Sequence, residues 1–367
     1  MRIGVDARLA DYTVGGIARY TTQLVSAEMA LGQDHSIITI RSRSPKVNPP
    51  TIPSSETLLA RTPPHHRIER FSLPWELRNA RLDVLHSPDC IPPRPGRWAS
   101  VITVHDLAFL RMPRLLTEES RRYYGEIRRA VQEAKAIIAV SQVTADDLVR
   151  LAGARPEKVH VVHEAADSEM QPMPRDTAKS LVGDRFAIAA PYVLFVGTLE
   201  PRKNIPGLIQ AFGHLRKDFP VRLVLAGRNG WLSEEIFMTV RSQALEDGVS
   251  FLGEVSPEEL RTLYCAAEVL VLPSLYEGFG LPAVEAMACG TPVVVANTGA
   301  LPEIVGEAGV LVRPDDPLDI AEALGWVLGN PGYREVLSAR GIERAATFSW
   351  ERAARETMAI YEQVAGG

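Results

Sequence analysis

Two glutamates eight positions apart form the pattern that most directly indicates chemistry. They bound a segment that follows an apolar run and opens a helical pattern ending at Gly290: Glu277, Gly278, Phe279, Gly280, Leu281, Pro282, Ala283, Val284 and Glu285. Glycines let a backbone approach a ligand without an interfering Cβ, and a helix start presents unpaired N–H groups to an anion. Carboxylates accept hydrogen bonds from the hydroxyl groups of ribose and hexose. We therefore expect both glutamates to face one long ligand, Glu277 from the loop and Glu285 from about one turn inside the helix.

The same segment admits a second interpretation. Residues 278–283 match the GxGxxA pattern of dinucleotide-binding turns. Two features weigh against a nicotinamide cofactor, because Glu277 would stand beside a pyrophosphate and Pro282 removes one N–H group from the turn. The segment also lies late in its domain, whereas the dinucleotide pattern follows a first strand. An NAD-dependent oxidoreductase is the alternative that this pattern leaves open.

A pair of neighbouring cations forms the second pattern. Arg202 and Lys203 stand between a strand-like run at 192–197 and a helical pattern whose expected N-cap is Asn204. Positive charge at the carboxyl end of a strand, beside a helix start, can neutralise the charge that builds on a departing diphosphate. An Arg-Lys pair by itself is more often solvated surface, and its position before the two-glutamate segment favours a site.

Polar residues and glycines also follow the expected strands of the first half. Gly15 and Gly16 separate the first strand from the first helix, either as a turn that exposes N–H groups to a ligand or as a plain tight turn. His105 ends a strand and precedes Asp106, which either orients the histidine or caps the next turn. Ser141 follows another strand and is expected to cap a helix.

Alternating strands and helices would position these residues. Short apolar runs predict strands at 2–6, 36–40, 83–86, 101–105 and 136–140, and again at 192–197, 221–227, 250–253, 269–273, 292–296 and 310–312. Helical patterns cover 17–31, 117–135 and 349–364, while Ser256-Pro257 and Asp316-Pro317 are typical helix starts. Such alternation predicts an α/β protein whose parallel sheets are covered by helices on both faces.

The alternation lapses twice. Ser44–Pro64 is rich in Pro and Ser and is expected to form a long loop. Residues 167–185 are polar and contain prolines, which is typical of a linker. Because 367 residues exceed one ordinary core, two domains are the default. We predict two doubly wound, Rossmann-like domains over 1–170 and 171–348 that face a central cleft, and a final helix at about 349–367.

Composition limits the classes of function. The chain is 46% hydrophobic and 23% charged, and no apolar run reaches the roughly 18–20 residues of a membrane span. Residues 1–170 carry 23 Lys and Arg against 20 Asp and Glu, and the remainder carries 17 against 25, which argues against a general nucleic-acid binder. Widely spaced Cys90, Cys265 and Cys289 fit buried free thiols. With no signal-peptide pattern, we expect a cytoplasmic protein.

Together the motifs resemble those of the retaining GT-B glycosyltransferases of family 4, which include bacterial mannosyl- and glucosyltransferases. The resemblance covers nearly the whole chain, including the final helix, which in relatives packs back on the first domain. It implies that Arg202 and Lys203 bind the diphosphate of a nucleotide-sugar donor, that Glu277 contacts the donor sugar and that Glu285 contacts the ribose. The backbone N–H groups that would meet the diphosphate or the sugar are those of Phe279, Gly280 and Leu281.

The resemblance also implies roles in the first half. Gly15 and Gly16 would lie near the donor phosphate and the acceptor, and His105 would hydrogen-bond a donor-sugar hydroxyl, as a catalytic candidate beside Glu277 and the two cations. Residues 161–167 read VVHEAAD where many members read Pro-Asn-Gly-Val-Asp. This version resembles the branch of GDP-mannose-dependent polysaccharide enzymes. It favours GDP-mannose as donor, with UDP-glucose as another candidate and a glycan or lipid-linked acceptor.

Several expectations concern cofactors, mechanism and surfaces. The 367 residues contain no Asp-x-Asp sequence, so we expect neither a metal nor another cofactor. Retention would arise by front-face attack or by double displacement, for which Glu277 is the candidate nucleophile. Arginine-rich segments at 61–81 and 111–129, with Phe71 and Trp75, form either solvated helix faces or a contact with an acceptor or the inner membrane surface. A non-catalytic sugar-nucleotide-binding module and an epimerase of similar architecture remain as alternatives.

Overall fold

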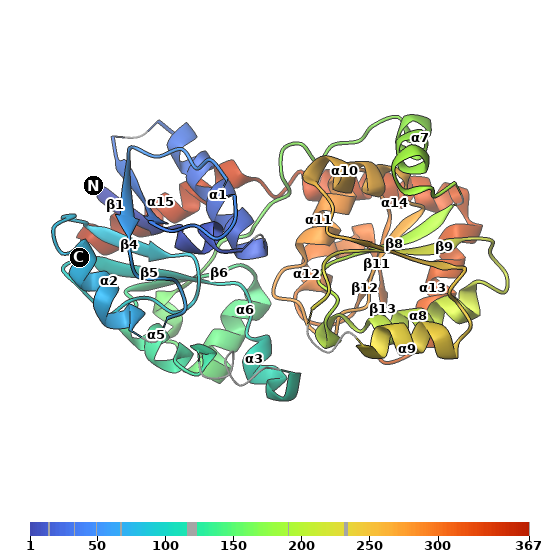
Figure 1. Ribbon diagram of the computed structural model, residues 1–367, viewed down its shortest axis with the longest axis horizontal. Helices are drawn as coiled ribbons and strands as arrows, with labels where there is room; N and C mark the ends of the chain where they lie inside the picture. Colours follow the sequence, from blue (N-terminus) through green and yellow to red (C-terminus); the bar gives the residue numbers. More distant parts are fainter. Residues whose placement is uncertain are drawn as a thin grey trace. The chain divides into compact units, whose positions relative to one another are not determined.

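The computed structural model describes all residues except 14, 33, 49, 67, 116–122, 190, 231–233 and 367. Contacts divide the chain into two compact units, each of which is visible in Figure 1. The first unit comprises Met1–Glu164 and Ser349–Gly367, and the second comprises Ala165–Phe348. The chain therefore enters the second unit a few residues before the predicted position 170.

The first unit is built on a parallel sheet. Within the described residues the sheet has seven strands in the order β3-β2-β1-β4-β5-β6-β7. The strands are β1 (Arg2–Asp6), β2 (Ser36–Ser42), β3 (Glu56–Ala60), β4 (Val84–Ser87), β5 (Ala99–Val104), β6 (Ala136–Ala139) and β7 (Val159–Val161). The helices are α1 (Gly16–Ala30), α2 (Glu69–Leu77), α3 (Ala108–Arg111), α5 (Ile127–Glu133), α6 (Gln142–Asp147) and α15 (Trp350–Gly366).

Helices cover both faces of this sheet because successive side chains of a strand point to opposite faces. Val101 of β5 and Ile138 of β6 pack with α1 and α15, whereas Ile102 and Ile137 pack with α5 and α6. In Figure 1, α1 and α15 accordingly lie on one side of the sheet and α2, α5 and α6 on the other. The last helix of the chain thus contributes to the core of the first unit.

The second unit repeats the same plan. Its described residues form a six-stranded parallel sheet in the order β10-β9-β8-β11-β12-β13. The strands are β8 (Tyr192–Val196), β9 (Arg222–Ala226), β10 (Val249–Gly253), β11 (Val269–Leu272), β12 (Val293–Ala296) and β13 (Gly309–Val312). The helices are α7 (Arg175–Phe186), α8 (Ile205–Leu215), α9 (Glu234–Ser242), α10 (Pro257–Ala266), α11 (Leu281–Ala288), α12 (Leu301–Val305), α13 (Pro317–Gly329) and α14 (Pro331–Ala345).

Each sheet has one point where the order of its strands reverses. That point lies between β1 and β4 in the first unit and between β8 and β11 in the second. The connections after these neighbouring strands leave to opposite faces of the sheet, which opens a crevice at their carboxyl ends. Because β8 and β11 are buried along their whole length, they form a rigid base for the loops that follow them.

Four segments differ from the predicted elements. The predicted loop Ser44–Pro64 contains β3, which pairs with β2 at the edge of the sheet. The predicted linker at 167–185 contains most of α7, a polar helix in which Ala178 and Val182 are buried. Strand β7 was not predicted. Of the predicted helix at 117–135, α5 covers Ile127–Glu133, and residues 116–122 lie outside the described part of the chain.

Helix capping agrees with the sequence at three of the four predicted positions. Ser256 forms a capping box, Asp316 accepts N–H groups of its helix, and Ser141 accepts one from the first turn of α6. Asn204 is the N-cap residue of α8, as predicted, but its side chain makes no capping hydrogen bond. Its backbone is left-handed (φ 53°), and its side-chain amide donates to the carbonyl of Pro314 (2.5 Å) instead of capping α8.

Candidate active site

The cations and the first glutamate of the sequence motifs form one hydrogen-bonded cluster in the second unit. Lys203 Nζ donates to Glu277 Oε1 (2.6 Å), and Arg202 Nη1 donates to Glu277 Oε2 (2.9 Å). The hydroxyl of Ser274 donates to Glu277 Oε1 (2.6 Å). Arg202 and Lys203 lie 75 and 74 positions before Glu277 in the sequence, and both bind its single buried carboxylate.

Two loops at the reversal point of the sheet build this cluster. The loop after β8 ends in a short 3₁₀ turn, Pro201–Lys203, and the loop after β11 carries Glu277. Arg202 connects the two, since its carbonyl accepts the N–H of Leu275 (2.9 Å) and its Nη1 donates to the carbonyl of Tyr276 (2.9 Å). The cluster therefore lies where open α/β sheets bind ligands.

A third loop, which follows β12, holds the backbone around Glu277 through hydrogen bonds. The N–H of Ala300 donates to the carbonyl of Glu277 (2.9 Å), and the hydroxyl of Thr298 donates to the carbonyl of Ser274 (2.8 Å). Between them Gly299 has a positive φ of 58°, and a Cβ there would lie 2.5 Å from the carbonyl oxygen of Glu277. The position of Glu277 therefore depends on glycine at 299.

The charges within the cluster stabilise one another. Burial alone would raise the pKa of Glu277, but Lys203, Arg202 and the hydrogen bond from Ser274 outweigh it and lower that pKa to about 2. Arg202 is also paired with Glu200, whose Oε1 lies 2.8 Å from Nη2. The cluster holds two cations against two carboxylates, so an entering diphosphate would have to compete with Glu277 and Glu200 for the cations.

The second glutamate lies in α11 and is almost completely buried. Glu285 is 2% exposed, and its Oε2 accepts a hydrogen bond from the hydroxyl of Tyr264 in α10 (2.9 Å). Phe279 is buried and packs edge-on against Phe348 at 5.8 Å between ring centroids. The hydrogen bond from Tyr264 fixes the orientation of the Glu285 carboxylate before any ligand is bound.

Helix α11 starts directly after the glycines of the motif. Gly280 is its N-cap with a positive φ of 99°, and a Cβ at this position would lie 2.5 Å from the side chain of Leu301. The helix therefore begins at Leu281, one residue before the predicted start at Pro282. Its first N–H groups lack acceptors within the helix, which favours negative charge at this end.

His105 lies in the first unit and uses both ring nitrogens within the protein. Nδ1 lies 2.7 Å from Glu164 Oε1, and Nε2 lies 2.9 Å from the carbonyl of Pro88. Both partners are acceptors, so each ring nitrogen must carry a proton to make both hydrogen bonds. Only the protonated ring has a proton on each nitrogen. Burial alone would lower the pKa of His105, but Glu164 and the Pro88 carbonyl raise it above the ordinary value. Tyr20 packs edge-on against the ring.

The other predicted residues of the first unit lie at the start of a helix and in a turn. Gly15 is the N-cap of α1, which begins at Gly16, and a Cβ at either glycine would meet open space. Asp106 accepts the N–H of Ala108 (3.0 Å) and so caps the following turn, while Glu164 orients His105. Of the two roles considered for Asp106, the structure supports capping.

Comparison with known proteins identifies the family. The family model described as "Glycosyl transferases group 1" matches residues 186–344, and the model described as "Glycosyltransferase Family 4" matches residues 14–169. The O-antigen chain mannosyltransferase B of Escherichia coli is 35% identical over 294 residues, which cover 78% of this chain and 76% of that protein. The chain belongs to glycosyltransferase family 4. It is an enzyme that transfers glycosyl groups.

Further relatives agree with this assignment. A D-inositol 3-phosphate glycosyltransferase of Xylanimonas cellulosilytica is 31% identical over 387 aligned positions, 95% of this chain and 92% of that protein. The sucrose-phosphate synthase of Thermosynechococcus elongatus has the same fold, with a TM-score of 0.81 over 99% of this chain and 98% of that one at 23% identity. The fold of this family 4 enzyme is GT-B, and the alternatives of an oxidoreductase, an epimerase and a non-catalytic module are set aside.

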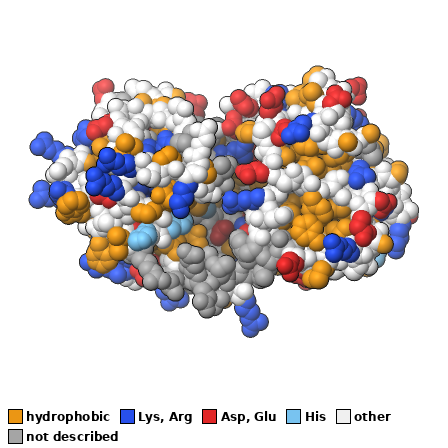
Figure 2. Space-filling view, viewed as in Figure 1, with side chains coloured by type: hydrophobic (Ala, Val, Ile, Leu, Met, Phe, Trp, Pro, Cys, Tyr) orange, Lys and Arg blue, Asp and Glu red, His pale blue; other side chains and the backbone are white. Residues whose placement is uncertain are grey.

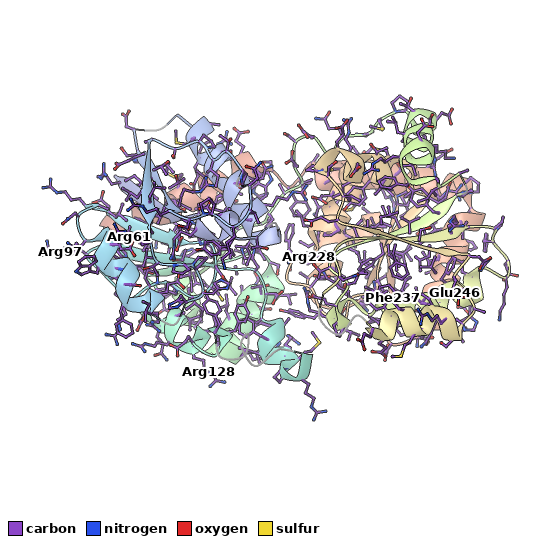
Figure 3. The ribbon with its side chains drawn as sticks, in the orientation of Figure 1. Arg61, Arg97, Arg128, Arg228, Phe237 and Glu246 are labelled. Atoms are coloured by element: carbon purple, nitrogen blue, oxygen red, sulfur yellow. The ribbon has the colours of Figure 1, made fainter. Side chains whose placement is uncertain are left out.

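Three polar residues of this glycosyltransferase were not predicted. Glu164 orients His105, Glu200 pairs with Arg202, and Arg228 follows β9 beside the cation loop, where its carbonyl accepts the N–H of Leu199 (2.9 Å). Figure 3 labels Arg228 at an edge of the second unit. Arg228 could have been recognised from the sequence, because it is a basic residue at the carboxyl end of a strand. Glu164 has no such signal, because it lies in the stretch that differs from the common family turn.

The described residues contain neither a metal-type cluster nor a membrane-spanning helix. Among the described residues, no group of three or more His, Cys, Asp or Glu is arranged to hold a metal ion. None of the described helices combines the length and apolar character of a membrane span. The three cysteines are free and buried, as the sequence predicted.

Proposed function

We propose that this family 4 enzyme transfers a hexose with retention of anomeric configuration, and that its donor is GDP-mannose and its acceptor a glycan or lipid-linked sugar. The choice of mannose rests on the mannosyltransferase relative of Escherichia coli together with the sequence at 161–167. Such an enzyme would act in polysaccharide or glycoconjugate synthesis.

The observation that carries the proposal is the joint contact of Arg202 and Lys203 with Glu277. In the donor complex the two cations would bind the diphosphate and stabilise it as a leaving group, and Glu277 would accept a hydrogen bond from the sugar. Glu285, held by Tyr264, would accept hydrogen bonds from the ribose. These assignments place positive charge where negative charge develops in the transition state.

Retention is assigned to front-face attack. Glu277 Oε1 accepts hydrogen bonds from Lys203 and Ser274, and Oε2 accepts one from Arg202. A carboxylate stabilised in this way is a weak nucleophile, because covalent attack would cost these three contacts. The leaving phosphate oxygen would instead take the proton of the acceptor hydroxyl. Because Glu277 also contacts the sugar in this proposal, loss of turnover in Glu277→Gln does not distinguish the two mechanisms. A glycosyl adduct on Glu277, detected by mass spectrometry after incubation with the donor, would contradict front-face attack.

We infer that the reaction needs no metal. Arg202 and Lys203 would supply the positive charge that a divalent ion supplies elsewhere. Transfer should therefore continue in excess EDTA, and loss of activity that Mg²⁺ or Mn²⁺ restores would contradict this inference.

A thermal-shift screen tests the donor assignment. GDP, UDP and ADP and their hexose conjugates are each added to the full chain, and a ligand at 100 times its dissociation constant should add about 2.7 kcal/mol of stability. We expect GDP and GDP-mannose to give the largest shifts. Anomeric proton couplings of the product, measured by NMR, then report retention or inversion. Absence of a shift with every nucleotide would overturn the proposal.

Contact with a membrane surface is part of this proposal. Phe71 and Trp75 lie on one face of α2 and are 57% and 66% exposed, with Arg94 stacked on Phe71 (4.3 Å) and Arg78 on Trp75 (4.0 Å). Figure 2 shows hydrophobic and basic side chains together on the outer surface of this unit. Aromatic residues flanked by arginines suit the boundary of an anionic membrane.

Two other arginines of the basic segments are already paired with acidic residues. Arg70 binds Glu126 and Glu133, and Arg111 binds Asp147 through two nitrogens. Arg67 and residues 116–122 lie outside the described part of the chain. Sedimentation with anionic liposomes at low salt tests the contact, which a Phe71→Ser/Trp75→Ser variant should weaken. Protein that stays in the supernatant would contradict it.

A further inference from the structure

Two of the three cysteines meet at the ends of neighbouring helices in the second unit. Cys265 lies in the last turn of α10 and Cys289 is the C-cap of α11, and these two helices pack side by side (Figure 1). Cys265 Sγ lies 3.9 Å from the carbonyl oxygen of Cys289, and the two thiol groups are hydrogen-bonded to each other. Both residues are buried, at 9% and 5% exposure. The fold therefore brings together two thiols that are 24 positions apart in the sequence.

Each cysteine adjoins a residue of the candidate active site. Cys265 directly follows Tyr264, whose hydroxyl donates to Glu285 Oε2 (2.9 Å). The N–H of Cys289 donates to the carbonyl of Glu285 (3.0 Å). Thr291, two residues after Cys289, donates its hydroxyl to the carbonyl of Tyr264 (2.7 Å). A covalent link between the two sulfur atoms would therefore act directly on the backbone that carries Tyr264 and Glu285.

The surroundings of Cys265 favour its thiolate form. The hydrogen bond from the Cys289 thiol, a backbone hydrogen bond from Met173 and the positive charge of Arg261 outweigh burial and lower the pKa of Cys265. The contact with Cys265, together with burial, raises the pKa of Cys289, which stays a thiol. Because the thiolate is the nucleophile in thiol oxidation, Cys265 is the sulfur that reacts first, and Cys289 stands next to it as the second thiol.

We propose that Cys265 and Cys289 form a reversible disulfide bond that weakens binding of the sugar donor. Hydrogen peroxide is the oxidant: the Cys265 thiolate attacks one of its oxygens, the O–O bond breaks, and the leaving hydroxide takes up the thiol proton as water. The Cys289 sulfur then attacks the sulfur of the Cys265 sulfenic acid, which forms the S–S bond and releases the second oxygen as water. Two thiols and one peroxide thus give one disulfide and two waters, and a dithiol reverses the change.

The effect on the donor rests on the function proposed above, in which Glu285 contacts the ribose, whereas the bond itself does not. A disulfide brings its sulfur atoms to about 2.05 Å, well inside the hydrogen-bond contact of two thiols, so the ends of α10 and α11 must shift. The hydrogen bond from Tyr264 to Glu285 joins the same two helices. Since displacements of about 1 Å at positioning groups are costly, we expect GDP to bind at least about tenfold more weakly to the oxidised chain.

Thiol counting by mass spectrometry tests the bond. The full chain is treated with hydrogen peroxide, unfolded and labelled with N-ethylmaleimide, which adds once to each free thiol. The reduced protein should take three labels, and the oxidised protein should take one, on Cys90, and regain three after dithiothreitol. A joined pair of peptides containing Cys265 and Cys289 identifies the bond. Retention of all three labels, or loss of labels without this joined pair, would overturn the proposal.

Three single variants assign the two chemical steps. Cys265→Ser removes the reactive thiolate and should make GDP affinity insensitive to peroxide. Cys289→Ser removes the second thiol, so the sulfenic acid should persist on Cys265, where dimedone traps it. Cys90→Ser changes a buried cysteine in the core of the first unit and should still form the bond. A loss of GDP affinity in oxidised Cys265→Ser as large as in wild type would refute the assignment.

Failure of this inference can be told apart from failure of the proposed function. Isothermal titration calorimetry measures GDP binding to the reduced and the oxidised wild-type chain, with Cys90→Ser as the control. If the bond forms and GDP binds equally well to both forms, the regulatory effect fails while the donor proposal stands. If no nucleotide binds to the reduced chain, the proposed function fails and the effect on donor binding fails with it, while the labels still decide whether the bond forms.

Discussion

Lys203 Nζ lies 2.6 Å from Glu277 Oε1, although the two residues belong to different loops of the second unit. Arg202 binds the other oxygen of the same carboxylate. The cations of the site are therefore neutralised by an acid of the same site before any donor arrives. A ligand that brings its own negative charge must take the place of this carboxylate or share the cations with it.

Replacement of Glu277 should separate product affinity from turnover. Glu277→Gln removes the charge that competes for Arg202 and Lys203, so we expect GDP to bind several-fold more tightly by isothermal titration calorimetry. Transfer should nevertheless fall by about 10²-fold or more, since the carboxylate no longer stabilises the transition state. Glu254→Gln, at an exposed glutamate of the same unit, should change neither quantity. Weaker GDP binding in Glu277→Gln would contradict this account.

The same carboxylate should make the second unit sensitive to acid. Its folded-state pKa is about 2 against an ordinary value of 4.5, so the stabilisation is fully present above pH 4.5 and is lost as the pH falls toward 2. The difference corresponds to about 3 kcal/mol. Chemical denaturation should therefore show a gap in free energy of unfolding between wild type and Glu277→Gln that shrinks between pH 5 and pH 3. A gap independent of pH would show that Glu277 is not held by the cations.

Glu164 should control the protonation of His105. The folded-state pKa of His105 is raised, so the stabilisation from this pair is complete below the ordinary value of 6.5 and is lost as the pH rises through the raised pKa. Glu164→Gln removes the charge and should lower the pKa of His105. Titration of the imidazole Cε1–H signal by NMR, assigned with His105→Gln, measures this shift. If transfer requires the protonated ring, the alkaline limb of kcat/KM should move to lower pH in the same variant. An unchanged titration would exclude the pairing.

Gly299 should be required for the geometry of the site and not for its charge. In Gly299→Ala the new Cβ would collide with the backbone of Glu277, and the positive φ adds strain of about 1 kcal/mol or more. We expect at least about a tenfold loss of kcat with the second unit still folded by circular dichroism. Gly332→Ala serves as the control, because a Cβ at Gly332 meets nothing within 4 Å. Equal kinetics in the two variants would remove the proposed role of this loop.

Local signals in the sequence were sufficient for much of the fold. The capping box at Ser256 and the cap at Asp316 depend on neighbours within a few residues, and both are present in the structure. The buried strands were recognisable from short apolar runs. Strand β3 was missed because it is an edge strand with three of its five residues exposed and prolines before it. Helix α7 was missed because few of its residues are apolar.

Contacts between distant segments could not be predicted from the sequence. Nothing near His105 indicates that its partner is Glu164, 59 positions away, and the nearer Asp106 was the natural candidate. The motifs predicted which residues gather at the reversal point of the second sheet, but not that Glu277 neutralises the two cations there.

Tyr361 should anchor the last helix of the chain to the first unit. Its hydroxyl lies 2.6 Å from His86 Nδ1, and His86 Nε2 lies 2.8 Å from the hydroxyl of Thr103, which in turn contacts Tyr20 (3.0 Å). Burial lowers the pKa of His86 to about 3, so the neutral ring needs one donor and one acceptor. Tyr361→Phe leaves one buried nitrogen without a partner.

We expect this substitution to cost about 1–3 kcal/mol in the free energy of unfolding, the price of one unsatisfied buried polar group. The loss should appear in the unfolding of the first unit, while the stabilisation by GDP through the second unit stays as in wild type. Tyr333→Phe, at a partly exposed tyrosine of α14, should leave both quantities within about 0.5 kcal/mol of wild type. If Tyr361→Phe is equally neutral, hydrophobic packing alone holds α15, and the buried chain from Tyr361 to Tyr20 adds no stability.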